Sequence, residues 1–282
     1  MNLREAYRNY LSRLQPIYGP IEAGMVTDWV FEYLLQLKKA DVVKDPDQKI
    51  NKLSQQKIDK ALAQLLEHKP IQYVLGEAWF YKMQFKVNKQ VLIPRPETEE
   101  LVEWIITDYK LQIADFSILD IGTGSGCIAV SLKKNIPSAN ITAVDISTPA
   151  LNIAKENAAT HNADINFIKL DFLDESKWSK LPSFDIIVSN PPYIPIAEKI
   201  KLDKNVTEYE PGTALFVPDE SPLLFYDKIA RFGKTHLNKK GKIFVEIHED
   251  FGAATAGLFN KFYKKVTIKK DIFGKERMLM VT

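Results

Sequence analysis

The sequence predicts an α/β fold, with a seven-stranded, mostly parallel sheet that ends in an antiparallel hairpin, preceded by a small all-helical domain. Two observations support this. After about residue 117, short apolar runs alternate with segments of helical period, a pattern typical of parallel strands joined by crossover helices. Before residue 76, apolar residues recur at helical spacing only. We therefore expect a helical domain over 1–75, a β-hairpin linker over 76–97 and an α/β domain over 98–282.

Composition fits this organisation. The chain has 282 residues, of which 45% are hydrophobic and 26% charged, so it can build one large or two modest packed domains. A net charge of +2 argues against a protein that mainly covers nucleic-acid phosphates. The single cysteine, Cys127, rules out an intrachain disulfide and indicates a reducing compartment. With no signal peptide and no apolar run long enough to span a bilayer, we expect a cytoplasmic protein.

The first 97 residues contain the helices and the linker. Gly19-Pro20 should break the first helix, and apolar positions over 21–39 and 58–66 form helical stripes. The partly alternating run Trp79–Val87, followed by Asn88-Lys89 and Gln90–Ile93, predicts a hairpin. Prolines on both sides of Arg95 should then hold the chain extended, and Thr98 is placed to cap the next helix.

The rest of the chain alternates strands and helices. The expected strands are 118–121, 141–145, 165–170, 184–189, 241–247, 266–272 and 277–281. The expected helices are 126–134, 148–160, 222–237 and 250–261. The last two strands are joined by a tight turn at Gly274, so they should be antiparallel neighbours.

The segment Asn190-Pro191-Pro192-Tyr193 directly follows the strand 184–189. Ligands of open α/β sheets bind at the carboxyl ends of the strands. Two consecutive prolines remove two backbone donors and leave carbonyl groups without intrachain partners. The segment should therefore form a rigid, acceptor-rich rim with an aromatic wall, suited to a neutral, planar –NH2 group.

A glycine loop, Gly122-Thr123-Gly124-Ser125-Gly126, lies between a strand and a helix. In a dinucleotide fingerprint the third glycine would stand one place later, where this chain has Cys127, and no P-loop lysine follows. Asp145 ends the next strand, where a carboxylate binds ribose hydroxyls. Asp171 and Phe172 end the third, where they could bind and stack on an adenine. Cys127 is better explained as a packing residue than as a nucleophile.

A nucleoside without a pyrophosphate, S-adenosylmethionine, fits these features, and the fold is then a Rossmann-like methyltransferase. The expected cofactor-binding residues are Gly122, Thr123, Gly124, Ser125, Gly126, Asp145, Asp171, Phe172 and Asn190. The four histidines, His68, His161, His236 and His248, show no ligand spacing, so no metal is expected.

Three motifs taken together resemble the PrmC/HemK family of release-factor glutamine N5-methyltransferases. They are Ile93-Pro94-Arg95-Pro96-Glu97-Thr98-Glu99, the glycine loop, and Val188–Ile194, which includes the Asn-Pro-Pro-Tyr tetrad. The resemblance covers essentially the whole chain, and the first motif is its most specific part. Two positions depart from the family pattern, Asp171-Phe172-Leu173 and the segment Glu246–Gly252.

The resemblance implies methyl transfer from S-adenosylmethionine to the glutamine amide in the Gly-Gly-Gln motif of class I release factors. It implies that Asn190, Pro191, Pro192 and Tyr193 bind the glutamine, with Asn190, Pro191 and Tyr193 catalytic. We expect the Asn190 side-chain oxygen and the Pro191 carbonyl to accept the two amide hydrogens. Tyr193 should pack on the amide through its ring face, so Tyr193→Phe should cost little. No general base is assigned.

Some alternatives stay open. The tetrad is also found in amino-group methyltransferases of DNA and RNA bases, and a nucleoside-binding protein without chemistry is a second alternative. Arg95 and Glu97 could hold the peptide or serve only as a linker. We expect a monomer whose partner is a release factor, with no membrane and no direct nucleic-acid contact, and whose helical domain contacts that factor.

Overall fold

The computed structural model describes residues 1–109 and 116–282. The chain divides into two units: Met1–Glu77 with Asp203–Tyr209, and Ala78–Leu202 with Glu210–Thr282. In the described ranges, no helix is both long and apolar enough to cross a membrane.

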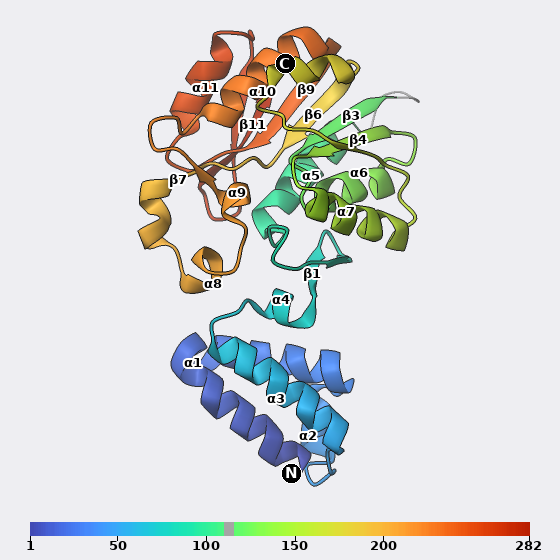
Figure 1. Ribbon diagram of the computed structural model, residues 1–282, viewed down its shortest axis with the longest axis vertical. Helices are drawn as coiled ribbons and strands as arrows, with labels where there is room; N and C mark the ends of the chain where they lie inside the picture. Colours follow the sequence, from blue (N-terminus) through green and yellow to red (C-terminus); the bar gives the residue numbers. More distant parts are fainter. Residues whose placement is uncertain (110–115) are drawn as a thin grey trace. The chain divides into compact units, whose positions relative to one another are not determined.

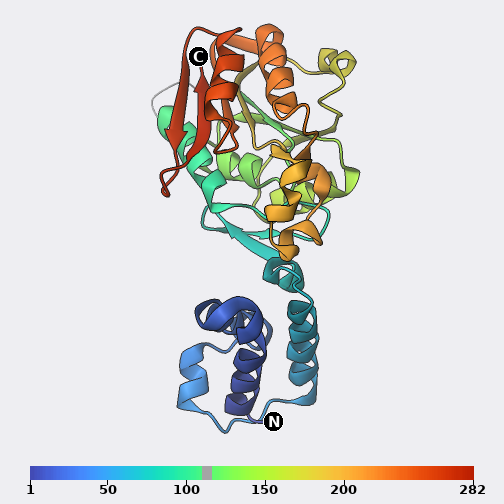
Figure 2. The same cartoon turned by 90° about the vertical axis from the view of Figure 1, so that its left-hand side faces the viewer.

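The first unit is helical. It contains α1 (Leu3–Leu35), α2 (Lys39–Lys44), α3 (Lys52–Leu66), α4 (Ile71–Leu75) and α8 (Lys204–Thr207). The predicted break at Gly19 is confirmed, because its φ of 71° and ψ of 172° are not helical and Pro20 follows. The two halves of α1 consequently run in different directions (Figure 2). Their apolar faces enclose the buried rings of Tyr10 and Phe31.

The second unit begins with a hairpin whose turn differs from the predicted one. Strands β1 (Glu77–Phe80) and β2 (Met83–Lys86) pair across Tyr81 and Lys82, which both have positive φ. A turn does occur at Asn88–Val91, where the Val91 N–H donates to the Asn88 carbonyl at 3.1 Å, but the structure shows no strand over Gln90–Ile93, so the predicted hairpin across Asn88-Lys89 is wrong. Burial of Phe80 and Phe85 on one core decides the register.

The main sheet has seven strands in the order β10-β11-β9-β6-β3-β4-β5. Their bounds are β3 Ser117–Ile121, β4 Asn140–Asp145, β5 Asn166–Lys169, β6 Phe184–Ser189, β9 Leu237–Glu246, β10 Val266–Lys270 and β11 Glu276–Val281. Strand β11 runs opposite to the other six, so it is antiparallel to both β10 and β9, and all other neighbouring pairs are parallel (Figures 1 and 2). The predicted mostly parallel sheet with a terminal antiparallel hairpin is confirmed.

Helices cover both faces of this sheet. Along β6, Ile186 and Val188 join one apolar cluster and Ile187 the other, as the alternation of a strand requires. Phe184 joins the cluster of Ile187 because the register shifts between Phe184 and Ile186. The first cluster includes residues of α5 (Pro96–Tyr109), α6 (Cys127–Asn135) and α7 (Thr148–Thr160). The second includes residues of α10 (Leu224–His236) and α11 (Gly252–Asn260) (Figure 1). Because helices cover both faces of the sheet, the ends of the strands are the places where a ligand can reach it.

Several short elements escaped prediction. The 3-10 helix η1 (Glu175–Lys180) follows β5. Between β6 and α10 lie β7 (Ile194–Pro195), the 3-10 helix η2 (Ile196–Lys201), α9 (Gly212–Leu215) and β8 (Phe216–Val217) in addition to α8. The two-residue strands β7 and β8 pair in parallel, so they hold the two ends of this connection together beside the tetrad.

Candidate active site

The structure brings the tetrad and the glycine loop to one edge of the sheet. Asn190 directly follows β6, the glycine loop follows β3, and β3 and β6 pair in parallel. The Ser189 hydroxyl donates to the Ile121 carbonyl oxygen at 2.8 Å, which ties the two strand ends together. The carboxyl edge thus holds the predicted residues of both groups.

The side chain of Asn190 is oriented by Thr98, from a different element. Asn190 Nδ2 donates to Thr98 Oγ1 at 3.0 Å, and Thr98 Oγ1 donates to Glu246 Oε2 at 2.5 Å. The amide oxygen of Asn190 is therefore the end that Thr98 leaves available. The prediction that Thr98 caps α5 is wrong: the helix already begins at Pro96, a residue suited to a first helical position.

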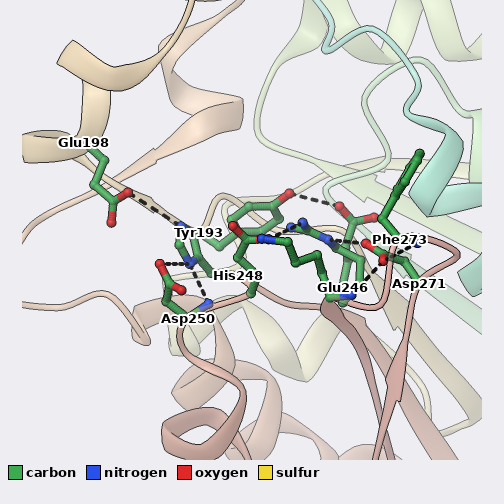
Figure 3. A network of polar contacts seen from close by, with 10 residues as sticks. Tyr193, Glu198, Glu246, His248, Asp250, Asp271 and Phe273 are labelled. Carbon is green, nitrogen blue, oxygen red and sulfur yellow. Dashed lines mark hydrogen bonds and ion pairs between the residues drawn. The ribbon is translucent and has the colours of Figure 1, made fainter.

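Tyr193 also uses its hydroxyl. The phenol donates to Glu246 Oε1 at 3.0 Å (Figure 3), and burial raises the pKa of Tyr193 above its ordinary value. In Tyr193→Phe, a buried carboxylate would lose one donor, at a cost of about 1–3 kcal/mol. We therefore expect Tyr193→Phe to have a substantial effect on methyl transfer instead of the small one predicted from the sequence, because the variant removes a donor that holds Glu246.

Glu246 connects these residues. It ends β9 and is 1% exposed, and the Tyr226 hydroxyl donates to its main-chain oxygen at 2.9 Å. Burial raises the pKa of Glu246, an effect partly offset by its hydrogen bonds and by the charge of Arg277. Sequence reasoning missed its role. The available signal was an acidic residue at the carboxyl end of an otherwise apolar strand.

Arg95 is fixed by a buried acid. Its guanidinium pairs with Glu210 Oε1 at 2.5 Å, and the other oxygen of Glu210 accepts from the Ile93 N–H at 3.1 Å. The Glu210 side chain is 1% exposed. The segment before α5 is thus tied to the end of the connection that carries α8 and α9, and Glu210 is a second residue that sequence reasoning missed.

The glycine loop has the backbone that its sequence predicts. Gly122, Gly124 and Gly126 all have positive φ, and the Gly122 and Thr123 N–H groups donate to the Val144 carbonyl at 2.9 and 3.0 Å. A Cβ added at Gly122 would meet no atom within 4 Å. The loop therefore presents open backbone at the carboxyl edge.

Asp145 lies against this loop. Its Oδ2 accepts from the Gly124 N–H at 2.9 Å and its Oδ1 from the Ser147 N–H at 2.8 Å, while burial raises its pKa. Each oxygen keeps a second lone pair, so ribose binding stays a prediction. The ring of Phe172 is 5% exposed and packs against Trp178 and Phe232. Stacking of Phe172 on an adenine would therefore require this core packing to open.

The donor and acceptor set fits S-adenosylmethionine. Ser125 Oγ and Asp120 Oδ1 are buried without a well-formed hydrogen bond, although the Ala129 N–H lies near enough to lower the pKa of Asp120 and the Ser125 hydroxyl near enough to lower that of Cys127. Buried polar atoms with only weak partners, next to open glycine backbone, are compatible with a site that a ligand completes. That the carboxylates of Asp145 and Asp171 bind the hydroxyl and amino groups of the nucleoside stays a prediction.

A glycine substitution tests the loop. At Gly126, φ is +80° and an added Cβ would lie 3.1 Å from the Ala154 Cβ. We expect Gly126→Ala to destabilise the protein by about 1–3 kcal/mol and to weaken cofactor binding. Gly257→Ala, at an exposed position inside α11 with nothing within 4 Å, is the control and should stabilise by about 0.5–1 kcal/mol. Equal effects of the two substitutions on urea denaturation would contradict this explanation.

Asp120 predicts a pH dependence of stability. Burial raises its pKa to about 7 from an ordinary 3.8. A carboxyl with a raised folded-state pKa supports stability below its unfolded pKa, and this contribution is lost as the pH rises through 7. We expect the melting temperature to fall between about pH 5 and about pH 8.5, and the fall to be smaller in Asp120→Asn. An unchanged slope in this variant would exclude Asp120 as its source.

The surroundings of the remaining candidates, Cys127 and His248, fit a structural role. Cys127 is buried, and burial raises the pKa of its thiol to about 12, which agrees with a packing role. His248 packs edge-on against Tyr193 and lies 3.9 Å from Glu198 and from Asp250 (Figure 3). Across 1–109 and 116–282, no cluster of three metal-ligating side chains occurs.

Two family models and full-length curated relatives match this chain. Residues 5–76 match the PrmC N-terminal domain, and residues 101–208 match the methyltransferase small domain. The release factor glutamine methyltransferase of Flavobacterium psychrophilum is 47% identical over 100% of this chain and 99% of its own. That of Streptococcus pneumoniae is 43% identical over 100% and 98%.

A solved structure shows the same fold. The Thermus thermophilus 16S rRNA N2 G1207 methyltransferase, in complex with AdoMet and guanosine, has a TM-score of 0.52 at 14% identity over 73% of this chain and 49% of its own. The solved structure shows the fold alone, whereas the relatives above 40% identity match along the full chain and identify the family. The chain belongs to the release factor glutamine methyltransferase family.

Proposed function

We propose that this protein transfers a methyl group from S-adenosylmethionine to the side-chain amide nitrogen, N5, of the glutamine in the Gly-Gly-Gln motif of class I release factors. The orientation of Asn190 carries the proposal. Its NH2 end is bound by Thr98, so its oxygen is left to accept from a substrate –NH2 group. Family membership selects a glutamine amide as that group.

In the proposed mechanism, the chain acts mainly by orientation. An amide nitrogen is a weak nucleophile because its lone pair is delocalised into the carbonyl. Asn190 Oδ1 and the Pro191 carbonyl accept its two hydrogens and turn the lone pair toward the donor, while Pro192 sets the turn and Tyr193 packs on the amide. Such positioning can supply roughly 7–11 kcal/mol. The cofactor supplies a methyl group on a sulfonium, and water takes the proton after transfer.

We place the cofactor on the glycine loop, with its ribose at Asp145 and its adenine at Asp171 and the backbone of Phe172. We further propose a cytoplasmic monomer whose first unit contacts the release factor. An amino-group methyltransferase of DNA or RNA bases remains the alternative, because an exocyclic base –NH2 is also planar.

One assay distinguishes these functions. Labelled S-adenosylmethionine is offered with a class I release factor, with its Gly-Gly-Gln glutamine→alanine variant, with DNA and with RNA. We expect label only in the unmodified release factor. Label in nucleic acid but not in the release factor would overturn the proposal in favour of the alternative.

A further inference from the structure

We infer that Thr98 and Glu246 are positioning residues that determine which end of the Asn190 amide faces the substrate. The inference rests on the proposed function, in which Asn190 must present its oxygen. The two ends of an asparagine amide have nearly the same shape, so packing alone selects between them weakly. Hydrogen-bond direction is what distinguishes them.

The direction starts at Glu246. A carboxylate accepts hydrogen bonds and cannot donate them. The single hydroxyl hydrogen of Thr98 is therefore committed to Glu246 Oε2, at 2.5 Å. Toward Asn190, Thr98 can offer only a lone pair, so the NH2 end of Asn190 turns to it, at 3.0 Å. The amide oxygen consequently points away from Thr98.

Glu246 is held on its other sides. Its Oε1 accepts from Tyr193 at 3.0 Å (Figure 3), which limits rotation of the carboxylate, and its main-chain oxygen accepts from Tyr226 at 2.9 Å, which holds the backbone that carries it. Burying a charge at a 1% exposed position costs stability. A neutral amide of the same size would avoid this cost but would bring hydrogens of its own. The charge is thus explained by the direction that it imposes on Thr98.

The variant Glu246→Gln tests this inference with almost no change in shape. The positive charge of Arg277 acts on both Tyr193 and Glu246 and favours the glutamine oxygen on the Tyr193 side, so its NH2 group faces Thr98 and donates. Thr98 then donates to the Asn190 oxygen, and Asn190 turns its NH2 end to the substrate. We expect turnover on the release factor to fall about 100-fold, with S-adenosylmethionine affinity within a few-fold of the original. Glu156→Gln, the same change at an exposed ion pair with Lys86, should keep full activity.

Adding Asn190→Asp to Glu246→Gln should restore the turnover that Glu246→Gln loses. Asn190→Asp alone sets an oxygen against the Thr98 lone pair and should be strongly impaired. In Glu246→Gln/Asn190→Asp, Thr98 donates to one oxygen of the introduced carboxylate and the other oxygen faces the substrate. We expect the double variant to exceed each single variant at least about tenfold, a non-additivity that a merely structural role would not produce.

An NMR measurement gives a readout without turnover. In 15N-labelled protein, the side-chain NH2 signals of Asn190, identified by their loss in Asn190→Asp, should exchange slowly with water and should exchange faster in Glu246→Gln. Unchanged exchange, Glu246→Gln turnover within about threefold of the original, or a double variant no better than the single ones would overturn the inference. A parent enzyme that does not label the release factor would instead overturn the proposed function.

Discussion

Replacing Asn190 by alanine is expected to lower kcat for release-factor methylation by about 10²–10³-fold, through loss of a fixed hydrogen-bond acceptor for the substrate amide. Asn190 is held by Thr98 in the orientation that presents its oxygen. Alanine removes this acceptor, and the substrate nitrogen loses the partner that would direct its lone pair. S-adenosylmethionine affinity should stay within a few-fold, because the glycine loop and Asp145 belong to other strand ends.

Single-turnover kinetics with labelled S-adenosylmethionine, together with calorimetric titration of the cofactor, separate the two effects. Asn152→Ala, at an exposed position of α7, is the matched control and should leave both quantities unchanged. Turnover of Asn190→Ala near that of the control would remove Asn190 from the mechanism. A loss of cofactor affinity equal to the loss of turnover would instead place Asn190 in cofactor binding alone.

The large elements of this fold could be predicted because their causes are local. The strand 184–189 and the helix 148–160 agree with the observed bounds residue for residue, since apolar periodicity and caps such as Ser147 act within a few positions. The kink at Gly19 was predictable for the same reason. The hairpin turn was not, because the burial of Phe80 and Phe85 in one core pairs the strands across Tyr81-Lys82, while the turn at Asn88-Lys89 forms without a strand after it.

The candidate site was predictable only in part. The tetrad and the glycine loop follow apolar runs and could be placed at strand ends from the sequence. Their partners could not, because Thr98 lies 92 residues from Asn190 and 148 from Glu246. Phe172 shows the same limit: a ring at a strand end can face a ligand or the core, and here Trp178 and Phe232 enclose it.

Arg95→Ala is expected to destabilise the second unit by about 2–4 kcal/mol, less than the roughly 3–5 kcal/mol typical of a broken buried ion pair because the Arg95 side chain is 32% exposed. The variant leaves the Glu210 carboxylate buried, with the Ile93 N–H as its remaining hydrogen-bond donor. A buried charge without its counter-charge favours unfolding or movement of this segment. Because Thr98 is only three residues from Arg95, turnover should also fall.

The double variant Arg95→Ala/Glu210→Gln separates the lost charge pair from the lost packing. The glutamine oxygen can still accept from the Ile93 N–H, and no charge is buried. We expect its urea midpoint to recover more than half of the loss seen in Arg95→Ala, since removal of both charges avoids the uncompensated one. If the double variant is instead as unstable as the sum of its single variants, Arg95 stabilises the segment through packing of its apolar stem, and the ion pair contributes nothing to it.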